Sequence, residues 1–87
     1  MPTKSRMREA IEPKVLGEIS DPQIIASGIS LRVRRRLRKL HGQGRWRKLK
    51  GVGYVRLVND SVRRAEIHWY ECHGIGRRKM KIKEFLD

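Results

Sequence analysis

The stretch that decides the fold runs from Lys50 to Phe85 and reads KGVGYVRLVNDSVRRAEIHWYECHGIGRRKMKIKEF. Short alternations of apolar and polar residues are separated in it by two clusters of turn residues, which is the pattern of strands joined by tight turns. The alternation predicts strands over Gly51–Val58 and Arg63–Cys72, and a third strand that begins at Gly76. We therefore expect a three-stranded antiparallel sheet.

Side-chain alternation also predicts the register, because the apolar sides of neighbouring strands must share one face. This condition sets Val55 opposite Ile67 after a three-residue loop, Asp60–Val62. Gly74-Ile75 suits a two-residue turn with glycine first, which sets His73 opposite Gly76 and Ile67 opposite Ile82. The expected core face then carries Val55, Leu57, Ile67, Trp69, Met80 and Ile82.

The opposite face is predicted to carry three cross-strand rows, Tyr54–His68–Lys81, Val52–Tyr70–Lys79 and Arg56–Glu66–Lys83, with Arg64 at the edge. Charge pairing explains the row of Arg56, Glu66 and Lys83. Rings among uncompensated lysines, as in the other two rows, are typical of surfaces that stack bases and contact phosphates. The alternative, a helix covering this face, would bury lysines without partners. We therefore expect the helix on the apolar face.

The N-terminal third predicts helical segments. Residues 1–20 form an expected arm of two short helical turns around Pro13, which either packs on the domain or orders on a partner. Asp21-Pro22 is a helix start signal and predicts a single turn over Pro22–Ala26. Apolar residues at i, i+4 and i+7 predict an amphipathic helix over Leu31–Leu40, stopped at Gly42. The expected fold is α+β, with this helical part packed on the sheet and one domain over residues 21–87.

The charge balance points to a polyanionic partner. The 87-residue chain has 22 Lys and Arg against 9 Asp and Glu, a net charge of +13. Such an excess opposes compact packing until a partner neutralises it, so nucleic acid is the first partner to consider. No apolar run is long enough for a membrane span and no signal-peptide core follows the N-terminus, so we expect a cytoplasmic protein without a membrane partner.

Basic residues gather on the expected helix and on the connection after it. Almost no acidic residue is interleaved to form i,i+4 pairs, so phosphate contact explains the helix better than a solvated face does. Trp46, in the connection, is expected to plug the core between helix and sheet. The candidate nucleic-acid contacts in these two segments are Arg32, Arg35, Arg36, Arg38, Lys39, Arg45, Arg47 and Lys48, and those on the sheet are Tyr54, Arg64, His68, Tyr70, Lys79 and Lys81.

Evidence for an enzyme is weaker in the sequence. The single cysteine, Cys72, has no zinc-ligand spacing with the histidines, and no phosphate-binding or dinucleotide motif is present, so we expect no metal and no cofactor. Metal-free RNA cleavage needs a base, an acid and cations for the phosphorane charge. His68, Tyr70 and Lys81 are the candidates for these catalytic roles.

Two resemblances bear on the function. GRWRKLKGVGYVRLV (44–58) and RRAEIHWYECHGIGRRKMKIKEFLD (63–87) resemble a group of small bacterial proteins that share RKLKG, HWYExHGIG and a closing KIK, without an assigned activity. A basic helix, an LKG stretch and an antiparallel sheet are similar in architecture to the messenger-cleaving toxins of bacterial toxin–antitoxin pairs. That second resemblance implies catalytic roles for His68, Tyr70 or Lys81.

The sequence thus predicts a small nucleic-acid-binding protein, with RNA favoured over DNA, that binds mainly through phosphate contacts. Two alternatives stay open: a metal-independent ribonuclease toxin, and a basic subunit neutralised by an acidic protein partner. The oligomeric state is left open as well.

Overall fold

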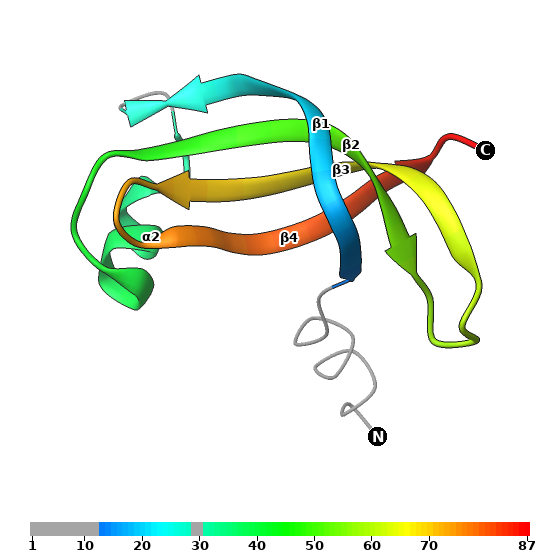
Figure 1. Cartoon of the computed structure of the whole chain (residues 1–87). Helices are drawn as coiled ribbons and strands as arrows, with labels where there is room; N and C mark the ends of the chain where they lie inside the picture. The colour runs from blue at the N-terminus through cyan, green and yellow to red at the C-terminus, as the bar shows by residue number, and fades with distance from the viewer. Residues whose placement is uncertain (1–12, 29–30) are drawn as a thin grey trace.

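The computed structural model describes residues 13–28 and 31–87. Its elements follow the chain as β1 (Lys14–Ser27), α2 (Arg34–His41), β2 (Trp46–Arg56), β3 (Val62–Cys72) and β4 (Gly76–Phe85). The strands form one antiparallel sheet in the order β1-β2-β3-β4, so each strand pairs with its neighbour in the sequence (Figure 1). The expected three-stranded sheet with helical segments before it is therefore wrong.

Strand β1 replaces the predicted N-terminal helical turns. The turn expected over Pro22–Ala26 is wrong, because pairing with β2 along its whole length outweighs the local helix signal of Asp21-Pro22. Asp21 and Gly17 have positive φ angles, 52° and 70°, and the register shifts around both of them. These irregularities bend the strand. Residues 1–12 of the expected arm lie outside the described residues.

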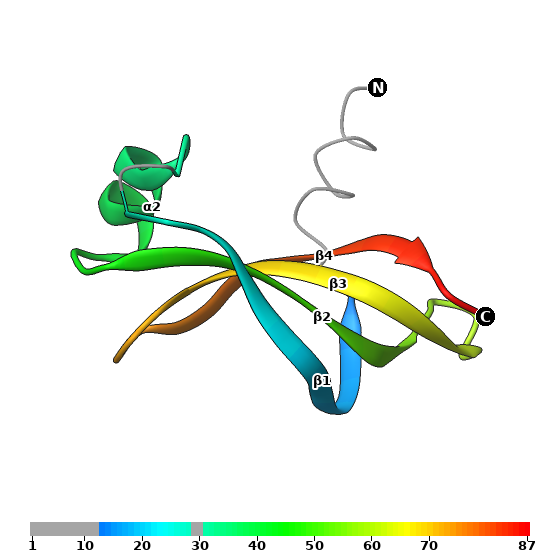
Figure 2. The same cartoon turned by 90° about the horizontal axis from the view of Figure 1, so that it is seen from above.

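The predicted core face is confirmed. Val55, Ile67 and Trp69 are buried in one cluster, and Leu57, Met80 and Ile82 pack against it. The bent strand β1 covers this face and adds Ile19 to the cluster (Figure 2). We call it the β1 face of the sheet.

Helix α2 packs on the opposite face, so its predicted place on the apolar face is wrong. It lies on the other side of the sheet from the bend of β1 (Figure 2), over one end of the sheet. Leu31 and Leu37 form a second buried cluster there with Trp46 and Cys72. Because strand β1 covers the apolar face, the helix packs instead on the second apolar cluster, around Trp46 and Cys72. Trp46 is fully buried, as expected for a core residue.

The predicted helix is confirmed, with different ends. It was expected over Leu31–Leu40 and runs over Arg34–His41, with Gly42 at its C-cap as predicted. The N–H of Gly42 donates to the carbonyl of Arg38 and closes the last turn.

The register between β2 and β3 differs from the prediction by four residues. Val55 pairs with Arg63 rather than Ile67. The three-residue loop comes two residues earlier than expected, because Asp60 takes a φ of 67° and its N–H donates to the carbonyl of Leu57. The shift is an even number of residues, so each side chain keeps its predicted face but gains different cross-strand neighbours.

The register between β3 and β4 is right in the middle of the strands and wrong at both ends, since Glu66 pairs with Glu84 instead of Lys83. Ile67 pairs with Ile82, as predicted. Towards the turn the register shifts by one, so that Cys72 pairs with Gly76 and the connection has three residues instead of two. The shift lies where Lys79 adopts a φ of 62°. It acts as a β-bulge, which sequence alternation alone does not reveal.

Candidate nucleic-acid interface

Four helix cations lie on one side of α2. With 3.6 residues per turn, positions 34, 35, 38 and 39 share a single arc of the helix. The four cations line a shallow depression together with Gln43 of the following loop. Leu37, on the buried side, fixes this orientation by packing on the sheet. We call Arg34, Arg35, Arg38 and Lys39 the helix stripe.

The helix stripe has no acidic neutralisation within the part of the chain that the structure describes. The ion pairs found in that part involve Arg47, Arg63, His68 and Arg77, and none comes from α2. Arg38 makes one hydrogen bond within the protein, since its Nε donates to the carbonyl of Gly44 at 3.3 Å. Arg35 and Lys39 are exposed. The stripe therefore presents concentrated positive charge to solvent.

The face of the sheet on which α2 packs carries, next to the helix, two cross-strand rows with the same kinds of side chain. Each has a ring on β3 between a cation on β2 and a cation on β4. The ammonium of Lys48 lies 5.7 Å from the centroid of the Tyr70 ring. Tyr70 also packs against the helix cluster, so the basic surface of the sheet begins at the foot of α2. We call these the basic rows: Lys48–Tyr70–Arg78 and Lys50–His68–Lys81.

The next row along the strands after the basic rows is Val52–Glu66–Glu84, which we call the carboxylate row. Glu66 has Val52 and Glu84 as its cross-strand partners, instead of the predicted Arg56 and Lys83. Its Oε2 lies 2.6 Å from Nε2 of His68. The hydrogen bond from His68 is the main cause that lowers the pKa of Glu66 below its ordinary value of 4.5. Glu66 is therefore charged at neutral pH and fixes the orientation of the imidazole.

The carboxylate row separates Tyr54 and Arg64 from the rest of the predicted surface. Tyr54 pairs with Arg64 rather than lying beside His68, and the residue is 54% exposed. The backbone N–H of Arg64 donates to Asp87 Oδ2, and this hydrogen bond is the main cause that lowers the pKa of that carboxyl. Tyr54 and Arg64 lie on the same face as the basic rows, but the carboxylates of Glu66 and Glu84 separate them from those rows.

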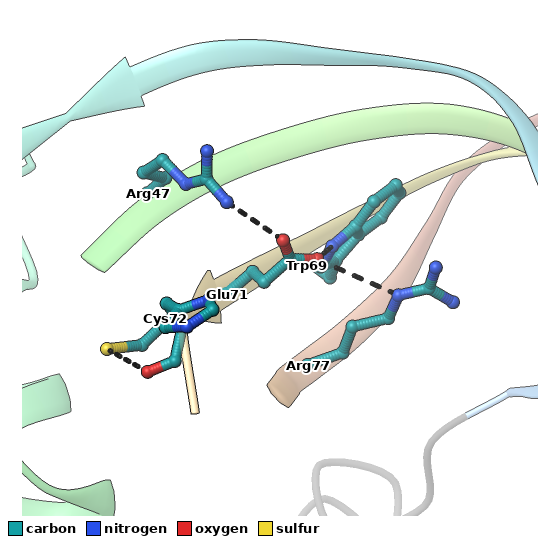
Figure 3. Close-up of polar contacts among 6 residues, drawn as sticks. Arg47, Trp69, Glu71, Cys72 and Arg77 are labelled. Atoms are coloured by element: carbon teal, nitrogen blue, oxygen red, sulfur yellow. Dashed lines mark hydrogen bonds and ion pairs between the residues drawn. The ribbon is translucent and has the colours of Figure 1, made fainter. Parts of the chain in front are cut away.

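Arg47 belongs to the β1 face and not to the basic surface. Figure 3 shows Glu71 between two arginines: its Oε2 accepts a hydrogen bond from Arg47 at 3.0 Å, and Arg77 lies on its other side at 3.8 Å. Trp69 Nε1 donates to the same carboxylate at 3.2 Å. This cluster satisfies Arg47 within the protein, which weakens its predicted role as a phosphate contact.

The remaining predicted residues have mixed positions. Arg32 and Arg36 are exposed outside the helix stripe, and Arg45 is exposed in the connection to β2. Lys79 lies in the bulge of β4 and is replaced by Arg78 as the neighbour of Tyr70.

Sequence reasoning did not select Arg34, Lys50, Arg78 or Gln43 as contacts. Lys50 and Arg78 alternate with core residues, so the sequence contained a signal for them. That signal places them beside His68 and Tyr70 only when the register between the strands is known. The partnership of His68 with Lys81 was predicted and is confirmed. Gln43 gave no signal, because only the packing of α2 brings its loop beside the stripe.

The described residues contain neither a metal-ligand cluster nor a membrane-spanning helix. Within 13–28 and 31–87, no three His, Cys, Asp or Glu side chains gather in a way that could hold a metal ion. No helix in the same ranges is long and apolar enough to cross a membrane. In the comparisons with known proteins, no family model, no curated protein and no solved structure matches the chain.

Proposed function

We propose that this protein binds nucleic acid, with RNA favoured over DNA, mainly through phosphate contacts and in the cytoplasm. The observation that carries the proposal is that the helix stripe and the two basic rows belong to the same side of the sheet. Two sets of cations that were expected on opposite sides of the sheet thus lie on the same side of it. Phosphate binding would relieve the mutual repulsion of these cations.

The acidic residues support this assignment by their positions. Glu71 neutralises arginines on the β1 face, and Asp87 pairs with Arg63 near the chain end. Glu66 is held by His68 at the border of the basic rows. The described acidic side chains therefore leave the helix stripe without an ion pair, and a polyanion is the partner that complements it.

The proposal predicts steeply salt-dependent binding. With fluorescently labelled RNA, the logarithm of the association constant should fall linearly with the logarithm of salt concentration, by roughly 0.7 to 0.9 per phosphate contacted. Fluorescence anisotropy at several salt concentrations measures this slope. An affinity unchanged between low and moderate salt would contradict the proposal, and binding only to an acidic protein would favour the neutralised-subunit alternative instead.

A second candidate function, metal-independent RNA cleavage, rests on the hydrogen bond between Glu66 and His68. A carboxylate that fixes an imidazole is a frequent arrangement for a general base. In this role His68 would accept the proton of the ribose 2′-hydroxyl. The resulting 2′-oxygen would attack phosphorus and displace the 5′-oxygen, which takes a proton from Tyr70 or Lys81. The products would be a 2′,3′-cyclic phosphate and a 5′-hydroxyl.

For this candidate we expect RNA cleavage in the presence of a metal chelator, and its loss by at least about a hundredfold in His68→Ala. Binding of uncleaved RNA should persist in the same variant, because the cations around His68 are retained. Replacement of Glu84, which forms no hydrogen bond or ion pair with His68, by Gln serves as the control. Intact RNA after prolonged incubation with the unaltered protein would eliminate the catalytic role and leave the binding proposal in place.

A further inference from the structure

The basic rows repeat one arrangement, and this repetition points to the form of the ligand. Lys48 and Arg78 flank Tyr70, and two residues along the strands Lys50 and Lys81 flank His68. We propose that the rows form two phosphate subsites for consecutive nucleotides of an extended single strand that lies along β3. This inference rests on the proposed function and specifies its ligand.

Sheet geometry allows both cations of a row to reach one phosphate. Strands β2 and β4 lie on either side of β3, so the two cations of a row start roughly 9.4 to 9.8 Å apart. Long side chains starting at that separation can converge on a group above β3. Lys48 already does so, since its ammonium lies over the ring of Tyr70. Arg78 is held at the turn end by a hydrogen bond of 2.8 Å from its Nη1 to the carbonyl of Arg77.

The two subsites are separated by two strand residues, roughly 6.4 to 6.8 Å. This distance suits adjacent phosphates of one backbone. The His68 ring between the second pair is fixed by Glu66, and Lys50 contributes to the low pKa of that carboxyl. Lys50 thus serves both the carboxylate and the subsite, while Lys81 is exposed on the other side of the ring.

Helix α2 favours a single strand over a duplex. It stands on the same face immediately beyond the row of Tyr70, where Trp46 and Cys72 form its base. A helix with its side chains is about 10 to 12 Å thick, so it forms a wall across the path along β3. A duplex is stiff over roughly 150 base pairs and would meet this wall. A single strand can bend around it towards the helix stripe.

The carboxylate row limits the path at the other end. Glu66 and Glu84 face each other across β3 and β4, and they would repel a third phosphate. Arg56 and Arg64 lie beyond them on the same face and are exposed. This arrangement supplies a matched control, because two cations can be removed from the same face on either side of the carboxylates.

The experiment compares a single-stranded RNA of about 12 nucleotides with a blunt duplex of the same length, within the usual range of site sizes. In Lys50→Gln/Lys81→Gln we expect about tenfold weaker binding of the single strand and a salt slope reduced by about 0.7, for one lost phosphate. Lys48→Gln/Arg78→Gln should have a similar effect. Arg56→Gln/Arg64→Gln should leave both quantities unchanged, and duplex binding should be insensitive to either row.

The results separate this inference from the function on which it rests. Equal losses for the two probes, or an equal loss in the Arg56 and Arg64 control, would overturn the single-strand subsites while binding itself persists. Failure of the unaltered protein to bind either probe would overturn both. Thermal unfolding of each variant, expected to match the parent because none of these side chains is buried, verifies that the fold is retained.

Discussion

Replacing three cations of the helix stripe, in Arg34→Gln/Arg35→Gln/Lys39→Gln, should weaken RNA binding by about one hundredfold. Each lost phosphate contact is expected to contribute roughly 1 kcal/mol, and each 1.4 kcal/mol is a factor of ten in affinity. The salt slope should also fall by roughly 2 to 2.7, for three lost contacts. Arg38 is retained in this variant because its hydrogen bond to Gly44 holds the loop after the helix.

The matched control removes three cations from the far end of the same face, in Lys14→Gln/Arg56→Gln/Arg64→Gln. Both variants lose the same formal charge, so an effect of net charge alone would weaken binding equally in the two. Lys14 pairs with Arg56, and Tyr54 pairs with Arg64, all beyond the carboxylate row. We expect binding within about threefold of the parent for this control, because distant exposed charges are screened at physiological salt. Equal losses in the two variants would refute a local site on α2.

Replacing Gly51 by Ala should lower the free energy of unfolding by about 2 to 3 kcal/mol, near the upper end of the range for overpacking. A Cβ at Gly51 would lie well within the van der Waals contact distance of Ile19 Cγ2 and 3.1 Å from the carbonyl oxygen of Ser20. It would also lie 3.2 Å from Trp69 Cη2. Ile19 and Trp69 are buried and the carbonyl is backbone, so none of the three can move aside easily. Urea unfolding followed by circular dichroism measures the change.

Gly53→Ala is the control for this prediction. It lies two residues along the same strand on the same face, and its new Cβ would meet Ile67 Cδ1, the end of a flexible side chain, at 3.2 Å. We expect a change within about 1 kcal/mol, since the lost conformational freedom of glycine in the unfolded chain offsets part of the crowding. A double-mutant cycle with Ile19→Ala should show that the cost of Gly51→Ala falls when Ile19 is shortened. Equal costs in both backgrounds would show that β1 does not press on Gly51.

The structure confirms which face of the sheet each side chain was predicted to occupy. It does not confirm most of the predicted cross-strand pairs. Val55, Ile67 and Trp69 lie in the core because the two-residue period of a strand fixes which face each side chain occupies. Which residues lie opposite one another depends on loops and bulges. The positive φ of Asp60 moved the loop of the first hairpin two residues earlier, and the bulge at Lys79 moved Arg78 beside Tyr70. Neither conformation follows from alternation of apolar residues.

The N-terminal segment was predicted wrongly for a different reason. Asp21-Pro22 is a genuine local signal for a helix start, but Ile19 is buried only when this segment pairs with β2 and crosses Gly51. Local preferences amount to tenths of a kcal/mol per residue, while burial of an isoleucine contributes about 1.5 to 3 kcal/mol. Tertiary burial therefore decided that this segment became a strand.

By itself, the sequence determined the basic character of the protein, the helix stopped at Gly42, the core face of the hairpins and the polar face with His68 and Lys81. These features depend on composition and on local periodicity. Only the tertiary structure decided that α2 stands on the polar face, because β1 had already covered the apolar one. The placement of the helix stripe and the basic rows on the same side of the sheet follows from that competition for buried area, which local sequence patterns do not show.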